Sequence, residues 1–225
     1  KQMKKLISIL LSFLFIAFQS VKAEVGVGIT GAGHYFDASG TETTRQSGEK
    51  NTGSNSDSVI VPELFVEALF DNGGAIGFSY IPTREVGSES RSDTNSAGDT
   101  GTYTAEAELD NVIQIYADIP TPMAVAGFDI YVKAGIQHAT LKTLESLNSG
   151  STYPDADLLG LTLGLGTKGD LPYGNNLYYK AEATYTDFEN YTADSNSSPA
   201  NKAAFSCKLP SRDPTFTIFP ASFLY

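Results

Sequence analysis

The segment Leu158–Lys168 reads LLGLTLGLGTK and decides how this chain folds. Every second residue from Leu159 to Leu165 is leucine, and the residues between these leucines are glycine or threonine. A β-strand places alternate side chains on opposite faces, whereas a helix would distribute the same leucines around its axis. The segment therefore predicts a strand with one apolar face and one face of small or polar side chains.

Six other segments show the same alternation of apolar and polar residues. They are Val25–Phe36, Val59–Phe70, Ala75–Ile81, Thr104–Ile119, Gly127–His138 and Leu177–Phe188. Most are about ten or more residues long, which exceeds the usual strand of about 5–6 residues and matches the roughly 9–11 residues that cross a bilayer. With one strand counted after the last polar segment, the sequence predicts eight strands.

The connections between the predicted strands alternate in length. The short ones are Asp71–Gly74, Pro120–Ala126 and Asp170–Asn176. The long ones are polar and comprise Asp37–Ser58, Thr83–Tyr103, Leu141–Asp157 and Glu189–Asn201. Short turns on one side and long loops on the other are typical of up-and-down outer-membrane barrels, and lipid tolerates no open sheet edge. The sequence thus predicts an all-β chain, an eight-stranded antiparallel up-and-down transmembrane β-barrel.

Alternation alone does not say which face is inside. A soluble lipocalin-like barrel would turn the apolar face inward and the charges outward. Two features favour a membrane barrel instead. The polar face mixes glycine and alanine with charged residues, as a narrow eight-stranded interior requires. The apolar face carries aromatic residues near strand ends, as at a membrane interface, although the chain has no tryptophan. These residues are Tyr35, Phe70, Tyr80, Tyr103, Phe128, Tyr179 and Tyr185.

The first 23 residues have the pattern of a secretory signal peptide. A basic start is followed by the apolar run Leu6–Phe18, and the small residues Val21 and Ala23 precede the expected cleavage site. The run is too short to span a bilayer as a helix. An uncleaved amphipathic anchor is the alternative. We expect residues 1–23 to be removed and the mature barrel domain to begin at Glu24.

Charge and cysteine content exclude several classes of protein. The 225 residues include 15 Lys and Arg against 26 Asp and Glu, a net charge of −11. Removal of the first 23 residues changes this to −15, which argues against a nucleic-acid partner. The single cysteine excludes an intramolecular disulfide and a cysteine-based metal cluster. We expect no cofactor, no metal and a location in the cell outer membrane of a Gram-negative envelope.

At this point the chain resembles the small outer-membrane β-barrel superfamily, the porin-like domains of the opacity-protein and OmpA-barrel type. The resemblance rests on the signal segment, the opening Val25–Ile29 (VGVGI) and the eight-strand rhythm, and it covers Glu24 to about Asn201. It implies variable surface loops and a role as structural anchor, adhesin or narrow pore. The expected partners are outer-membrane lipid, lipopolysaccharide and the barrel-assembly machinery.

The C-terminal residues 202–225 depart from that pattern. An alternating apolar set with a terminal aromatic residue is present at Phe219, Ala221, Phe223 and Tyr225. Proline, which cannot donate to a ladder, interrupts this part of the chain. The prolines are Pro210, Pro214 and Pro220. Two interpretations stay open: a bent, irregular last strand, or a sequence that after about Lys202 is not the native end.

Ten charged residues are predicted to face the barrel interior. They are Glu63, Glu67, Glu106, Glu108, Asp110, Asp118, Asp129, Lys133, Lys180 and Glu182. In a narrow barrel such charges must pair, which favours an internal salt-bridge plug. The functional alternative is a narrow path that prefers cations, because acidic linings favour cations.

The sequence offers one weak enzymatic motif. His138-Ala139-Thr140 loosely resembles the His-x-Ser pair of lipid A deacylases, with Glu145 as a speculative orienting residue. His138 is predicted to face outward and His34 to face the interior. We expect no catalytic residues, and we interpret the chain as a non-enzymatic outer-membrane barrel with a structural or surface-recognition role through four long extracellular loops. A porin-like channel for small cations or solutes is the first alternative, and a lipid A-modifying hydrolase is the second.

Overall fold

The computed structural model describes residues 23–44, 50–94, 100–146, 153–171, 177–194, 203–208 and 210–217. Apart from Ala23, the predicted signal peptide lies outside these residues, as do the middle parts of the first three predicted long loops and the end of the fourth. Within the described ranges every regular element is a β-strand. No helix in this part of the chain is long and apolar enough to cross a membrane.

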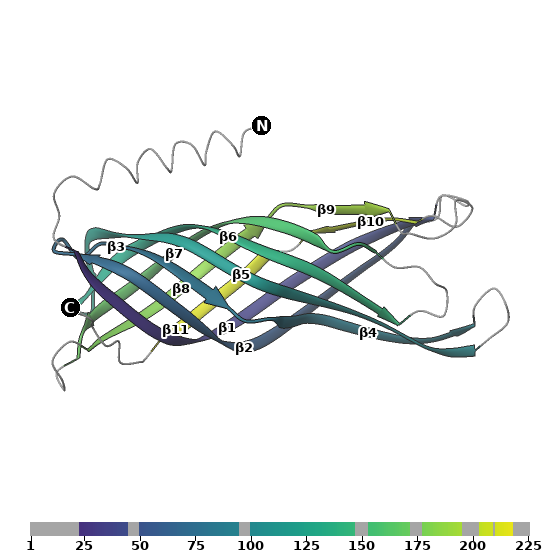
Figure 1. Cartoon of the computed structure of the whole chain (residues 1–225), viewed down its shortest axis with the longest axis horizontal. Coiled ribbons are helices and arrows are strands. Elements are labelled where there is room, and N and C mark those ends of the chain that lie inside the picture. Colours follow the sequence, from purple (N-terminus) through teal and green to yellow (C-terminus); the bar gives the residue numbers. More distant parts are fainter. Residues whose placement is uncertain are drawn as a thin grey trace.

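The described residues form eleven strands in one antiparallel sheet (Figure 1). The first six are β1 (Ala23–Thr44), β2 (Lys50–Phe70), β3 (Ala75–Ile81), β4 (Arg84–Thr94), β5 (Thr100–Val125) and β6 (Phe128–Ser146). The others are β7 (Ala156–Asp170), β8 (Tyr178–Phe188), β9 (Tyr191–Asp194), β10 (Ala203–Lys208) and β11 (Pro210–Thr217).

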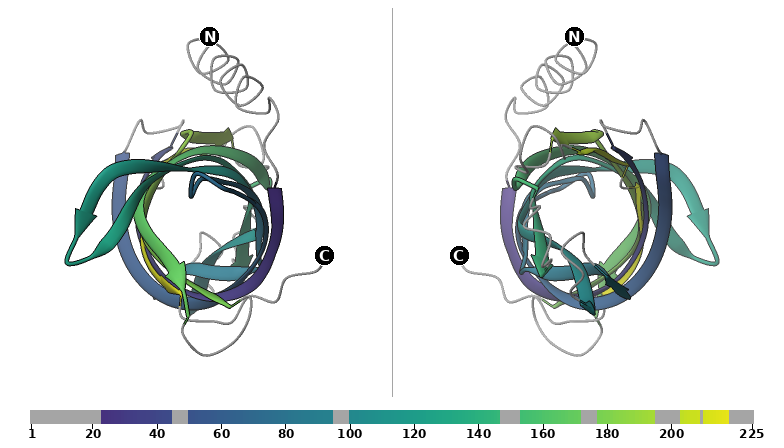
Figure 2. Two further views of the ribbon diagram at one scale, coloured as in Figure 1. Left: turned by 90° about the vertical axis from the view of Figure 1, so that its left-hand side faces the viewer. Right: turned by 90° about the vertical axis from the view of Figure 1, so that its right-hand side faces the viewer.

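The sheet closes on itself because β11 pairs with both β8 and β1. The closed path β1-β2-β3-β5-β6-β7-β8-β11 contains eight strands, and the end-on views of Figure 2 show the resulting ring. The remaining three extend the wall: β4 follows β3 along β5, β9 follows β8, and β10 precedes β11 along β1. The structure confirms the predicted all-β, eight-stranded antiparallel barrel.

The register of the ring sets its width. Starting at Gly26, we can step from each residue to its paired residue on the next strand until the path has gone once around the barrel. This path returns to β1 at Phe36, ten residues farther along the strand than Gly26. With eight strands, this stagger gives a strand tilt of about 40° and a backbone radius of about 8 Å. A ring of this width is filled by side chains and leaves no wide aqueous channel.

The last strand pairs irregularly with β1, and the interruption of its ladder coincides with a proline. β10 and β11 lie along β1 in one continuous register, from Thr44 opposite Ala203 to Gly31 opposite Phe216. This ladder has a gap on β1 between Ala32 and Tyr35, opposite Pro214, which has no N–H to donate. Residues 203–208 and 210–217 thus supply the eighth strand, and residues 218–225 lie outside the described residues.

The predicted long loops are shorter than expected because their ends are strands. β1 and β2 pair without interruption from Ala23 opposite Phe70 to Thr43 opposite Lys50. Serine, threonine, asparagine and glycine replace the apolar residues here, so the sequence pattern fades, but the backbone ladder continues. The segments predicted as Thr83–Tyr103, Leu141–Asp157 and Glu189–Asn201 likewise contain β4, the start of β5, the end of β6 and β9.

One predicted short connection is also wrong in extent. The segment Pro120–Ala126 belongs mostly to β5, whose register shifts between Pro120 and Ala124. The turn itself consists of Ala126 (φ 52°) and Gly127 (φ 85°). Positive φ at both central residues is the geometry of a type I′ hairpin turn, which matches the twist of the strands it joins.

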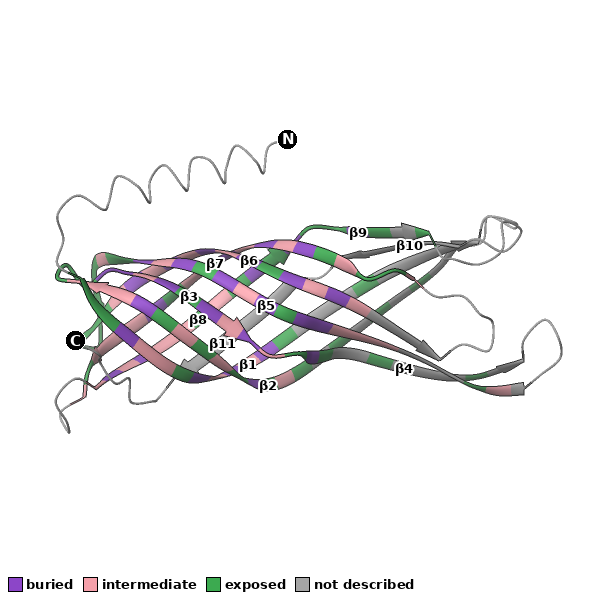
Figure 3. Cartoon of the chain, in the orientation of Figure 1, coloured by how far each residue is buried: buried purple, intermediate pink, exposed green. Residues whose placement is uncertain are grey.

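The apolar face of the barrel points outward. Where burial is described, more exposed and more buried residues alternate along the strands, as in β3 (Figure 3). The most exposed large apolar side chains are Ile60, 83% exposed, and Leu163, 63% exposed. The buried set inside is rich in polar and charged residues, among them Glu67, Lys133 and Lys180. This arrangement is the reverse of a lipocalin-like barrel, so that alternative is wrong.

Candidate functional site

The interior near the short turns holds a buried ionic cluster, which consists of Glu67, Asp118, Lys133, Lys180 and Glu182. At its centre, Lys180 Nζ on β8 lies 2.8 Å from Glu67 Oε2, 2.6 Å from Asp118 Oδ2 and 3.1 Å from Glu182 Oε1. Strands β2, β5 and β8 therefore meet at one ammonium group. None of these four side chains is more than 8% exposed.

A second ammonium group completes the ionic cluster from β6. Lys133 Nζ lies 2.7 Å from Glu182 Oε2 and 3.9 Å from Asp118 Oδ1. The same nitrogen lies 3.7 Å from the centre of the Tyr116 ring, a cation–π distance. Buried charges are tolerated when they are paired in this way, and removal of one partner then leaves an uncompensated charge.

Three tyrosines fix the carboxylates of the ionic cluster. The hydroxyl groups of Tyr116 and Tyr178 donate to Glu67 at 2.8 Å and 2.7 Å. Tyr131 donates to Glu182. Each of these carboxylates is therefore held by a tyrosine as well as by a lysine, which fixes its orientation.

Glycine makes room for two of these tyrosine rings. A Cβ atom on Gly77 would overlap the ring of Tyr116, and one on Gly166 would overlap the ring of Tyr131. The glycines on the polar faces of the strands therefore have a packing role, because the narrow interior holds large aromatic rings only next to residues without side chains.

A third lysine lies beside the ionic cluster. Lys168 Nζ is buried, has no hydrogen-bond partner among the described residues, and lies 5.4 Å from the centre of the Tyr131 ring. Lys168 sits directly across from Lys180 on the neighbouring strand. With Lys168 included, three ammonium groups accompany the three carboxylates of the ionic cluster, so this part of the interior is balanced in charge.

Half of the ten predicted interior charges form the ionic cluster. Asp129 lies exposed beside the β5–β6 turn, and Glu63 is half-buried. Glu106, Glu108 and Asp110 were predicted to face inward, but this prediction is wrong. Leu109 packs inside the barrel, so these three residues, at alternate positions beside it, lie on the outer face of β5.

The cause of that difference is a β-bulge at Asn111. The register of β5 against β6 shifts between Asp110 and Ile113, and Asn111 has a φ of 50°. The bulge reverses which residues point inward, so that Leu109 and Val112 both lie in the apolar core. Nothing in the alternation of polar and apolar residues marks this point except an asparagine, a residue that tolerates positive φ.

On the outer face, Asp110 is held by two neighbours. Its carboxylate lies 2.5 Å from Lys142 Nζ and accepts a hydrogen bond from the Thr83 hydroxyl group. These contacts lie on the long-hairpin side of the exposed apolar residues of β5. The hydrogen bonds from Lys142 and Thr83 hold the pKa of Asp110 below its ordinary value.

The interior near the long hairpins is filled by an apolar plug that the sequence interpretation missed. It consists of Val61, Ile81, Leu109, Val112, Ala139, Leu141, Leu158, Phe188 and Tyr191. A signal for it was present at Leu158, which precedes Leu159 and so places a leucine on each face of β7. The predicted interior of small, polar and charged residues is therefore wrong for this half of the barrel, where large apolar side chains pack inside.

The motif His138-Ala139-Thr140 does not form a nucleophile–base pair. The Thr140 hydroxyl group donates to Asp157 Oδ1 at 3.0 Å, and His138 Nε2 lies 3.7 Å from the same oxygen. The carboxylate thus lies between the two groups, and the His138 side chain is 48% exposed on the outer face, as predicted. The Glu145 side chain lies outside the described residues, and His34 is buried in the interior.

No set of three potential metal ligands comes together among the residues that the structure describes. The carboxylates of the ionic cluster face lysine instead.

No protein-family model matches the sequence, and no curated protein matches it. Among solved structures, the chain is similar to the outer membrane protein OprG from Pseudomonas aeruginosa, with 14% identity over 88% of this chain and 98% of that chain and a TM-score of 0.45. It is also similar to Ail, the attachment invasion locus protein of Yersinia pestis, in complex with the heparin analogue sucrose octasulfate (13% identity, 82% and 99% covered, TM-score 0.31). A second structure of Ail matches with 11% identity over 82% and 99% of the two chains and a TM-score of 0.29.

Proposed function

We propose that this chain is an integral β-barrel of the bacterial outer membrane and that it acts without catalysis, as an anchor that presents four long hairpins at the cell surface. The observation that carries the proposal is the closed ring with an apolar exterior. Exposed side chains such as Ile60, Ile115 and Leu163 would be unfavourable in water but are suited to lipid, and ring closure leaves no unpaired edge there.

A charge on the outer wall tests this proposal. In a bilayer, Leu163→Arg should lower the free energy of unfolding by about 2–4 kcal/mol if Leu163 lies near the midplane, because arginine is placed in hydrocarbon. Arginine at Ser54, an exposed residue of the β1–β2 hairpin, is the matched control and should change little. Guanidinium unfolding in lipid vesicles gives both values. Equal and small effects at both positions would contradict membrane insertion.

A gel-shift measurement tests the closed barrel separately. The refolded chain in detergent should migrate differently before and after boiling, because a closed barrel resists unfolding by the detergent. Identical migration would contradict a stable barrel whatever its location.

The surface-recognition role is supported by the hairpins themselves. The β1–β2 ladder continues to Thr43 and Lys50, well beyond Ile60, and its exposed residues include Thr52, Ser54 and Ser56. Small hydroxyl groups on a regular ladder offer hydrogen bonds without a preformed cavity. Deletion of residues 41–52 should abolish binding to a surface partner while the gel shift and the unfolding curve are preserved. Unchanged cell-surface binding after deletion of all four hairpin tips would refute this role.

A narrow cation path is the second candidate, and the three carboxylates of the ionic cluster are the observation that favours it. The packed ionic cluster and the apolar plug favour a closed interior instead, because an ion would have to pass both. Planar-bilayer recordings separate the two. We expect no discrete conductance steps, and steps that disappear in Glu67→Gln would establish the channel.

A further inference from the structure

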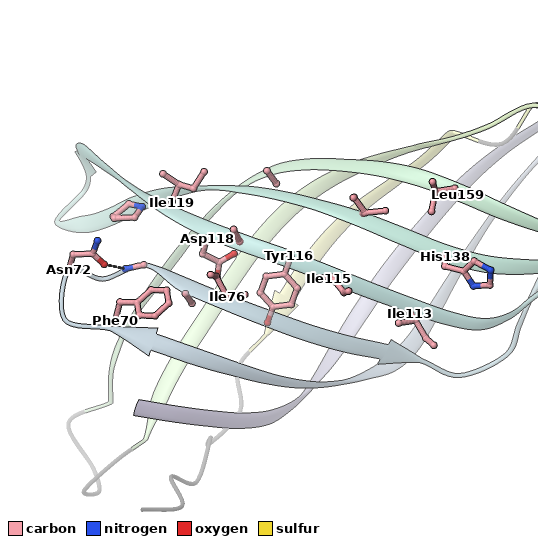
Figure 4. Close-up of a pocket in the computed structure, with 16 residues that line it drawn as sticks. Phe70, Asn72, Ile76, Ile113, Ile115, Tyr116, Asp118, Ile119, His138 and Leu159 are labelled. Carbon is pink, nitrogen blue, oxygen red and sulfur yellow. Dashed lines mark hydrogen bonds between the residues drawn. The ribbon is translucent and has the colours of Figure 1, made fainter. Parts of the chain in front are cut away.

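The outer wall of the barrel carries an apolar trough across β3, β5, β6 and β7 (Figure 4). Its volume is about 560 Å³. The floor is formed where two small residues, Ala117 and Ala134, pair directly across β5 and β6. Taller residues, Ile115 with Ile136 on one side and Ile119 on the other, stand above this floor.

The trough runs from the short turns toward the long hairpins. Asn72 lies at its turn end, and His138 and Leu159 lie at the opposite end, as Figure 4 shows. Between these ends the lining residues are mostly aliphatic, and they also include Tyr116 and Asp118 of β5. The polar groups at the hairpin end continue above the trough, where His138 contacts Asp157.

The chemistry of the lining limits what the trough can hold. The strands β5, β6 and β7 that form most of its floor are paired with neighbours on both edges, so an extended peptide would find no backbone hydrogen bonds there. A flexible aliphatic chain needs no hydrogen bonds from the wall. An amphiphile with its polar end at His138 meets polar side chains at its head and aliphatic ones along its tail.

We propose that this trough binds one acyl chain of a membrane lipid, with the lipid headgroup at the His138 end. This inference rests on the proposed membrane location and adds a defined lipid site to it. The bound chain would cover Ala117 and Ala134 and complete the apolar surface of the wall. A lipid held there should exchange more slowly than the lipids that surround the rest of the barrel.

The test compares two tryptophan variants of the full chain, since the natural sequence has no tryptophan. Ala134→Trp fills the floor of the trough. Ala183→Trp is the matched control, because Ala183 is exposed on the outer face of β8, away from the trough. Both variants and the parent are refolded in dioleoyl phosphatidylcholine vesicles, extracted into detergent and weighed by native mass spectrometry.

We expect the parent and Ala183→Trp to retain one lipid per barrel, and Ala134→Trp to retain about tenfold less. Ala117→Leu against Ala183→Leu repeats the comparison with smaller side chains if the tryptophan variant fails the gel shift. Equal retention in the paired variants, no retained lipid in the parent, or a dimer mass in place of the lipid-bound mass would overturn the proposal.

Fluorescence separates failure of the lipid site from failure of the membrane location. In vesicles of brominated phosphatidylcholine, tryptophan at position 134 and at position 183 should both be quenched if the outer wall faces lipid. Quenching at both positions without retained lipid would refute only the acyl-chain site. Absence of quenching at both positions would refute the membrane location as well.

Discussion

The two halves of the barrel interior are held together by different interactions. Near the short turns, the ionic cluster places Lys180 in contact with three carboxylates. Near the long hairpins, the apolar plug packs residues such as Leu109 and Leu158 through apolar contacts, beside the buried Arg84, which pairs with Leu109 across β4 and β5. Charge pairing is directional and depends on every partner, whereas apolar packing depends mainly on volume. The two halves should therefore respond differently to substitution.

The largest effect is expected in the ionic cluster. Lys180→Met keeps a similar aliphatic length but leaves Glu67, Asp118 and Glu182 facing one another, so the free energy of unfolding should fall by about 3–5 kcal/mol. Lys142→Met, which removes the partly exposed partner of Asp110, is the control and should have a smaller effect, because Lys142 is 36% exposed and water screens its charge more than it screens Lys180. Guanidinium unfolding in vesicles measures both. Similar losses would mean that the interior charges are not a coupled cluster.

The apolar plug should be sensitive to volume but tolerant of shape. Leu158→Ala, at a residue only 2% exposed, should lower the free energy of unfolding by about 3 kcal/mol through loss of apolar contacts and a remaining cavity. Leu158→Met should cost less than about 1.5 kcal/mol, because the volume is kept. The same unfolding measurement applies. A methionine variant as unstable as the alanine variant would show that the plug needs specific shapes.

The glycines beside the tyrosine rings should be needed for the ionic cluster, because a larger residue would displace the tyrosines that hold its carboxylates. Gly77→Ala would push Tyr116 away from Glu67, and we expect a loss of about 1–3 kcal/mol. Gly31→Ala is the matched control, because a Cβ atom there meets nothing within 4 Å. Its effect should be neutral or slightly stabilising. If the two alanine variants unfold at the same denaturant concentration, the proposed role of Gly77 is wrong.

The smallest effect concerns pH at the outer face. The pKa of Asp110 is lowered in the folded state, so its contribution to stability is present above the unfolded pKa of about 3.9 and is lost as pH falls through the lower folded value. The stability difference between the parent and Asp110→Asn, which the partial exposure of Lys142 keeps small at neutral pH, should therefore shrink as the pH falls below about 5. Unfolding curves at several pH values give the difference. A difference that grows on acidification would contradict the assigned pairing.

Much of the fold was predictable because a closed β-barrel repeats one simple rule along every strand. The alternation in Leu158–Lys168 and the spacing of short and long connections suffice for the ring of eight. Prediction from the sequence failed where the alternation of inward and outward residues is interrupted within a strand. The bulge at Asn111 reverses the faces of β5, and this displaced Glu106, Glu108 and Asp110 from their predicted positions.

For the ionic cluster, the sequence predicted which charged residues face the interior and that they must form ion pairs, but it did not predict which residues pair with each other. The sequence placed Glu67, Lys133 and Lys180 on the inner face, but a list of charges does not give the ring register that brings three carboxylates to one lysine. The apolar plug was missed for a related reason. Its members are spread over β2, β3, β5, β6, β7, β8 and β9, and each of these strands contributes only one or two of them.

The pairing of the first strand with the last has a kinetic consequence. Ala32 is paired with Thr215 across nearly the whole length of the chain, so the contact that completes the wall has a very high contact order. Until residues 203–217 have emerged, one side of β1 exposes unpaired N–H and C=O groups and can pair with the wrong chain. Assembly should therefore be all-or-none and late, and a nascent chain that ends before β10 should be a substrate for chaperones or aggregation rather than a smaller barrel.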